Sequence, residues 1–195
     1  MTSIAIAVFE GVEELDFAGP WEVLAAWATQ HPDDRVTVFT VADTTGLVRC
    51  AKGLRVAADH TWDTAPGIDV LVYPGGVGAR RELADPEVLE RLRGLREQGT
   101  LMTSVCTGAL VYAAAGLLRD RPATTWWGSL ETLAELEPTV EVRPDDRFVD
   151  SGEVITAAGV SAGIDMALHL VARLQSVERA REVRRYIQYD PEPPV

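Results

Sequence analysis

The stretch LMTSVCTGA, residues 101–109, joins a predicted buried strand directly to an apolar helix. Residues Leu101–Val105 form a short apolar run that is typical of a buried strand, and Thr107–Leu118 is rich in the small and apolar residues of a buried helix. Because no loop separates the two elements, Cys106 must take a tight and strained backbone turn. The sequence therefore predicts a strand–nucleophile–helix turn that presents Cys106 at the end of its strand.

Strands and helices alternate on both sides of this turn, which predicts an α/β fold with a mostly parallel sheet and helices on both faces. We expect a single domain over residues 1–195, ending in a proline-rich extended tail from Tyr189 to Val195. The predicted strands are Ser3–Phe9, Arg35–Val41, a hairpin of Val48–Cys50 and Leu54–Ala57, Ile68–Tyr73, Leu101–Val105, and a possible meander of Val140–Val142, Phe148–Asp150 and Val154–Thr156. The predicted helices are Trp21–Ala28, Pro86–Glu97, Thr107–Leu118, Ser129–Leu136, Ser161–Leu174 and Val177–Ile187.

Composition excludes several classes of function. The chain has 195 residues and a net charge of −12, which disfavours nucleic acids and anionic membranes as partners. No apolar run is long enough to span a bilayer, and the first residues resemble a strand rather than a secretory leader, so a cytoplasmic protein is expected. Two cysteines are too few for a disulfide framework, and no cluster of side chains has metal-ligand spacing.

Parallel sheets bind ligands beyond the carboxyl ends of their strands, and Cys106 lies at such an end. The helix that begins at Thr107 directs free N–H groups and the positive end of its dipole at the sulfur, so we expect a lowered thiol pKa and a thiolate. A buried structural cysteine is the competing interpretation. The position of Cys106 between strand and helix favours a functional role. No histidine stands immediately after Cys106, which argues against a cysteine–histidine dyad local in the sequence.

Three further residue groups lie near the same predicted edge. Asp16 stands between Leu15 and Phe17 after the first strand, so it is either a partly buried carboxyl with a raised pKa or a helix N-cap. The glycines in Pro74-Gly75-Gly76 follow another strand, and their N–H groups could form an oxyanion hole with that of Thr107. Trp126 follows Thr124-Thr125 and is a candidate wall of a substrate pocket, with core packing as the alternative.

These motifs, taken together and in this order, resemble the ThiJ/PfpI superfamily, and within it the isonitrile hydratase branch. The resemblance covers essentially the whole chain. It rests on Leu15–Pro20, Tyr73–Gly76, Thr103–Ala109, Ala114–Leu118, Ala123–Trp127, Gly159–Asp165 and the tail Tyr189–Pro194.

The resemblance implies a flavodoxin-like three-layer sandwich and a homodimer that acts on a small molecule without a cofactor. It implies that Cys106 is the reactive cysteine, that Asp16 is its acidic partner, and that Thr107 is the residue that follows the nucleophile in hydratases. The chain departs from the branch at Trp126, where related hydratases tend to carry histidine, and this departure concerns the substrate pocket.

The leading hypothesis is a cysteine-dependent isonitrile hydratase that works through a covalent thioimidate. Three alternatives remain open: a glyoxalase or deglycase acting on reactive aldehydes, a redox or stress sensor that works through oxidation of Cys106, and a stand-alone ligand-binding domain. Members of the superfamily with protease or deglycase activity often carry histidine after the cysteine. Thr107 stands at that position here, and this favours the hydratase.

Overall fold

The computed structural model describes residues 1–192, and the end of the predicted tail, residues 193–195, lies outside them. A seven-stranded sheet in the order β10-β11-β7-β6-β1-β2-β5 forms its centre. All neighbours in this sheet are parallel except the antiparallel pair β10–β11. Its strands are β1 (Thr2–Ala7), β2 (Val36–Ala42), β5 (His60–Thr61), β6 (Val70–Tyr73), β7 (Leu101–Val105), β10 (Phe148–Asp150) and β11 (Val154–Ala157).

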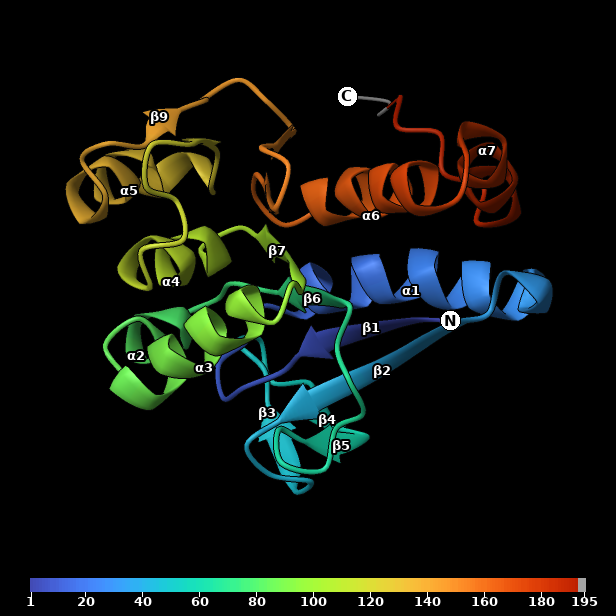
Figure 1. The fold of residues 1–195 in the computed structure, drawn as a ribbon, viewed down its shortest axis with the longest axis horizontal. Helices are drawn as coiled ribbons and strands as arrows, with labels where there is room; N and C mark the ends of the chain where they lie inside the picture. Colours follow the sequence, from blue (N-terminus) through green and yellow to red (C-terminus); the bar gives the residue numbers. More distant parts are fainter. Residues whose placement is uncertain (193–195) are drawn as a thin grey trace.

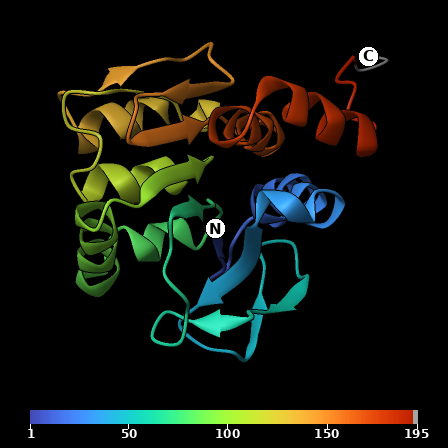
Figure 2. The ribbon, with the colours of Figure 1, turned by 45° about the vertical axis from the view of Figure 1, so that its right-hand side comes forward.

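Helices cover the sheet in two groups, which confirms the flavodoxin-like sandwich expected from the sequence. One group contains α1 (Glu14–Gln30), α6 (Ala162–Leu174) and α7 (Val177–Tyr186), which pack on one another. Figures 1 and 2 show the other group on the opposite side of the strands. Its members are α2 (Ala79–Glu82), α3 (Pro86–Glu97), α4 (Gly108–Ala114) and α5 (Leu130–Leu136).

The central strands are largely apolar and are buried along most of their length because helices cover both faces of the sheet. All four residues of β6 and of β11 are buried, and so is the second half of β1. A parallel sheet with two covered faces needs such continuous apolar runs. This is why the apolar runs of the sequence located these strands to within one or two residues.

The first helix begins seven residues earlier than predicted, at Glu14 rather than Trp21. Pro20, the residue before the predicted start, lies inside α1, where it is buried. Its ring packs against α6 at Gly163, whose missing side chain leaves room for it. The earlier start places Asp16 within the first turn of α1 and makes Glu13 the N-cap, so the N-cap interpretation of Asp16 is wrong.

Two other differences have local causes. Helix α4 ends at Ala114 rather than Leu118, because Gly116 turns the chain with a positive φ of 77°. The predicted meander does not form: β9 (Glu141–Val142) pairs with β8 (Pro122–Ala123) in a separate two-stranded sheet. The predicted hairpin does form, from β3 (Leu47–Arg49) and β4 (Arg55–Ala57). Within residues 1–192 no helix is both long and apolar enough to cross a membrane.

The turn at Cys106 depends on close backbone contact between β6 and the start of α4. A Cβ atom added to Gly108 would overlap the carbonyl oxygens of Tyr73 and Pro74. We therefore expect Gly108→Ala to destabilise the protein by about 1–3 kcal/mol, the usual cost of overpacking a close contact. Gly94→Ala is the matched control on α3, where an added Cβ meets no atom within 4 Å, so it should be neutral or slightly stabilising. Denaturant unfolding of the two variants checks this, and equal stabilities would contradict it.

Candidate active site

Four loops meet at the carboxyl edge of the sheet, after the adjacent strands β11, β7, β6 and β1. Cys106 follows β7 directly and adopts a left-handed backbone conformation, with φ of 56°. Such a conformation costs a non-glycine residue about 1–3 kcal/mol and persists only where its surroundings enforce it. Here the Cys106 N–H donates to the carbonyl oxygens of Ala157 (3.1 Å) and Ala158 (3.0 Å), and the Thr125 hydroxyl donates to the Cys106 carbonyl oxygen at 2.7 Å. The predicted strained turn is therefore present.

Two backbone N–H groups are directed at the Cys106 sulfur. One belongs to Thr107, at the start of α4, and the other to Val160, in the loop after β11. Val160 also has a positive φ, of 44°, which a β-branched residue rarely adopts. Both N–H groups favour the thiolate and lower the thiol pKa. Cys106 itself is only 6% exposed, so its sulfur meets solvent through a small opening.

Asp16 is fully buried beside Cys106. The Gly75 N–H donates to Asp16 Oδ2 at 2.9 Å, while Oδ1 lacks a conventional hydrogen-bond partner in the described chain. Burial raises the pKa of Asp16 from 3.8 to about 7, and the Gly75 N–H and the Cys106 thiol act in the opposite direction with smaller effect. The raised pKa predicted for this carboxyl is confirmed, and at neutral pH Asp16 is divided between its protonated and ionised forms.

The expected thiolate at Cys106 is wrong for the resting protein. Burial, and next the charge of Asp16, raise the pKa of the Cys106 thiol to about 12, although the two N–H groups lower it. The expectation considered only the helix terminus, which is outweighed by the loss of solvation and by a carboxylate next to the sulfur. The pair therefore titrates as a unit in which the carboxyl loses its proton first.

The glycine loop after β6 does not offer the free N–H groups predicted for an oxyanion hole. The Gly75 N–H bonds Asp16, and the Gly76 N–H donates to Thr107 Oγ1 at 3.0 Å. The loop instead links the start of α1 to the end of β6, because the Glu13 N–H donates to the Gly75 carbonyl oxygen at 2.9 Å. Gly75 thus positions the carboxyl, and Gly76 orients the Thr107 hydroxyl.

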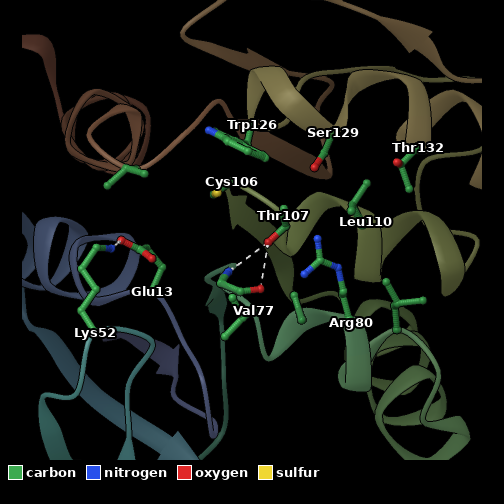
Figure 3. Close-up of a pocket in the computed structure, with 14 residues that line it drawn as sticks. Glu13, Lys52, Val77, Arg80, Cys106, Thr107, Leu110, Trp126, Ser129 and Thr132 are labelled. Atoms are coloured by element: carbon green, nitrogen blue, oxygen red, sulfur yellow. Dashed lines mark hydrogen bonds and ion pairs between the residues drawn. The ribbon is translucent and has the colours of Figure 1, made fainter.

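A pocket of about 420 Å³ opens above the sulfur (Figure 3). It is lined by Cys106, Thr107, Gly76 and Trp126, four of the six predicted site residues, whereas Asp16 and Gly75 lie beneath its surface. The Trp126 ring packs against Gly128 and Gly159, positions where an added Cβ would overlap it. Trp126 is therefore held rigidly as a wall of the pocket, as one of its two sequence interpretations stated.

Sequence reasoning missed several residues around this pocket. Val160 belonged to a motif of the resemblance but was assigned no role, although its position beside Gly159, just after a predicted strand, could have indicated one. Lys52, at the tip of the β3–β4 hairpin, reaches the pocket and pairs with Glu13 and, at 3.9 Å, with Glu14. No histidine lines the pocket, and the described residues include no group of three side chains suited to a metal ion.

The protein is an open α/β sandwich. It presents a cysteine on a strained strand-to-helix turn, beside a buried carboxyl, and these two features define its class. The chain belongs to the DJ-1/PfpI family, whose model matches residues 2–173. It is 38% identical to an isonitrile hydratase from Pseudomonas putida over 98% of this chain and 80% of that protein. It is 26% identical to a glutathione-independent glyoxalase, DJR-1.2 from Caenorhabditis elegans, over 89% of each chain. The crystal structure of a ThiJ/PfpI family protein from Pseudomonas syringae superposes with a TM-score of 0.89 at 31% identity, covering all of this chain and 77% of the other.

Proposed function

We propose that this protein is a cofactor-free hydratase that converts an isonitrile to an N-substituted formamide. The main support for the proposal is the buried Asp16–Cys106 pair at the base of a mostly apolar pocket. The carboxyl of this pair has a pKa of about 7, so it can both accept and donate a proton at neutral pH. The similarity to the Pseudomonas putida isonitrile hydratase supports the same reaction.

The first half of the reaction forms a bond between sulfur and carbon. The terminal carbon of an isonitrile accepts a nucleophile and a proton at the same atom. As Cys106 attacks, the Asp16 carboxylate takes the thiol proton and passes it to that carbon, giving a thioimidate, RN=CH–S–Cys106. General-base assistance is needed because the thiol pKa, about 12, leaves very little thiolate at neutral pH.

The second half releases the product with water. Asp16, again a carboxylate after the first step, removes one proton from a water molecule that attacks the thioimidate carbon, and the second proton of that water moves from the new hydroxyl group to the nitrogen. The C–S bond then breaks, Asp16 returns its proton to the departing sulfur, and RNH–CHO leaves. One water molecule is consumed, and the thiol and carboxylate of the starting state are restored.

Neighbouring groups support these steps. The Thr107 and Val160 N–H groups stabilise negative charge on the sulfur as it departs. The Thr107 hydroxyl, bonded to Gly76, lines the pocket beside the sulfur and can hold the attacking water. Trp126 supplies an apolar wall for the substituent of the isonitrile.

The alternatives have less support from the site. A glyoxalase is suggested by the similarity to DJR-1.2, but the identity is lower and the pocket contains no histidine to relay protons between carbons. A redox sensor needs an exposed cysteine with a low pKa. Cys106 is almost buried and its pKa is raised, so easy oxidation is not expected of the resting protein.

A turnover assay tests the proposal. Purified protein is incubated with phenyl isocyanide, cyclohexyl isocyanide or methylglyoxal, and products are separated by chromatography. We expect many equivalents of N-formyl product per protein chain from at least one isonitrile. Lactate formation from methylglyoxal without any formamide would favour the glyoxalase, and the absence of both products would refute the proposed function.

A further inference from the structure

The pocket above Cys106 has an uneven chemical character. Its volume of about 420 Å³ suits a ligand the size of a substituted benzene ring. Most of its wall is apolar and surrounds the space beyond the sulfur. The apolar lining side chains are Val77, Ala79, Leu83, Leu110, Trp126 and Val160.

Among residues 1–192, only three charged side chains line this pocket, and two of them neutralise each other. Lys52 forms an ion pair with Glu13, so the hairpin contributes little net charge. Arg80, on α2, has no ion pair and no side-chain hydrogen bond to any residue of the described range 1–192. Figure 3 shows its guanidinium group pointing from α2 into the pocket.

Several other arginines also lack an acidic partner within residues 1–192, but Arg80 is the one among them that lines the pocket. The guanidinium of Arg81, the next residue, donates to the Glu10 carbonyl oxygen at 2.6 Å. Arg91, on α3, pairs with Asp43 at 3.2 Å. Arg80 therefore keeps its donors available at the wall of the pocket while these neighbouring arginines use theirs within the protein.

Hydroxyl groups line the same pocket as Arg80. Thr132 lies on α5 and Ser129 directly precedes this helix; Figure 3 shows the Ser129 hydroxyl and the Arg80 guanidinium on opposite sides of the space between Cys106 and Leu110, with Thr132 beyond Leu110. A guanidinium binds a carboxylate through two parallel hydrogen bonds, and hydroxyl groups can donate to the same oxygens. The pocket thus combines a reactive sulfur, a largely apolar wall and, apart from the sulfur, a guanidinium group that can bind an anion.

We propose that Arg80 is a specificity-determining residue that selects substrates carrying a carboxylate at the end opposite the reacting group. Together with the proposed function, on which the identity of the reacting group rests, this makes the substrate class a short isocyano-carboxylate. Its apolar spacer would lie against Leu110 and Trp126, and its carboxylate would meet Arg80.

Paired substrates of equal shape test this inference. The wild-type protein is assayed with 4-isocyanobenzoate and with its neutral analogue 4-isocyanobenzamide. We expect kcat/KM to be about 10- to 100-fold higher for the carboxylate, as for a charge-assisted hydrogen bond. In Arg80→Gln the ratio should fall below about threefold through a higher KM for the carboxylate, with kcat largely kept. Arg80→Lys should restore part of the preference.

Arg55→Gln is the matched control, since Arg55 is an exposed arginine on β4 that does not line the pocket. It should leave the ratio unchanged. Equal kcat/KM values for the two substrates in the wild type, or a preference that survives in Arg80→Gln, would overturn the inference while leaving the hydratase intact.

Binding measurements test the anion site at Arg80 independently of the proposed reaction. Calorimetry with 4-formamidobenzoate and 4-formamidobenzamide measures anion preference without turnover. If no isonitrile is converted but the carboxylate still binds about tenfold or more tightly in an Arg80-dependent manner, the reaction is wrong and the anion site is supported. If neither ligand pair shows an Arg80-dependent preference, the anion site is refuted.

Discussion

Replacing Cys106 with alanine is expected to lower kcat for formamide production by at least about 10³-fold, because the covalent route then has no nucleophile. The fold should remain, since alanine is smaller than cysteine and the backbone hydrogen bonds that hold the turn do not involve the side chain of residue 106. Cys106→Ser should be almost as inactive, because a serine hydroxyl holds its proton more tightly than the thiol. Circular dichroism and steady-state kinetics on the same preparations check both statements.

Cys50 provides the matched control for this prediction. It is the other cysteine of the chain, it is 3% exposed, and it lies in the β3–β4 hairpin outside the pocket. Cys50→Ala should therefore keep turnover within a few-fold of wild type. Full activity in Cys106→Ala, or equal losses in the two variants, would contradict the assignment of the nucleophile.

Replacing Asp16 with asparagine is expected to lower kcat by about 10²- to 10⁴-fold, the usual contribution of a positioned general acid–base. The amide oxygen of asparagine can still accept the hydrogen bond from the Gly75 N–H, so the conformation of the loop should be retained. It can neither take the thiol proton nor return it. Kinetics against pH add a second readout: the rise of the wild-type rate with an apparent pKa near 7 should be absent in Asp16→Asn.

The same variant should be more stable than the wild type above neutral pH. The pKa of Asp16 is about 7 in the folded protein and 3.8 when exposed, so its favourable contribution is complete below pH 3.8. It is lost as the pH rises towards 7, because the unfolded chain ionises first. Over this interval the loss is on the order of 4 kcal/mol, at ~1.4 kcal/mol for each pKa unit. The Tm difference between Asp16→Asn and wild type, followed from pH 4 to 8, should therefore increase with pH.

Asp34→Asn is a control of opposite sign. Hydrogen bonds from Arg179 and Trp27 outweigh the effect of burial and lower the pKa of Asp34. Its stabilising contribution is present above the unfolded pKa and is lost as the pH falls. Asp34→Asn should thus be less stable than wild type at neutral pH, with the difference shrinking in acid.

A Tm difference between Asp16→Asn and wild type that is independent of pH would contradict the account of Asp16. It would mean that the Asp16 carboxyl is not held in a destabilising environment.

The parts of this site that were predictable from sequence are those determined locally. Cys106 lies where an apolar strand meets an apolar helix without a loop, and this pattern alone indicates a strained turn. Asp16 and Gly75 were located less directly, through the rule that parallel strands bring their carboxyl ends to one edge. That rule identifies which loops meet but not which N–H group bonds which acceptor.

The remaining features depend on burial and side-chain packing, which a single sequence does not reveal. The thiol pKa was predicted in the wrong direction because the helix terminus is visible in the sequence, whereas the loss of solvent around the sulfur is not. Arg80 lies on a helix of four residues that no periodicity indicates. The oxyanion hole assigned to Gly75 and Gly76 was not found because their N–H groups bond Asp16 and Thr107 across the loops.

The proposed hydration of an isonitrile by Cys106 and Asp16 passes through a covalent intermediate, and rapid-quench mass spectrometry can detect that intermediate. Wild-type protein is mixed with excess phenyl isocyanide, stopped in acid at successive times, and its intact and peptide masses are measured. The mechanism predicts a transient mass increase equal to one isonitrile molecule, located on the peptide that contains Cys106. Formamide that accumulates while Cys106 remains unmodified at every time point would contradict it.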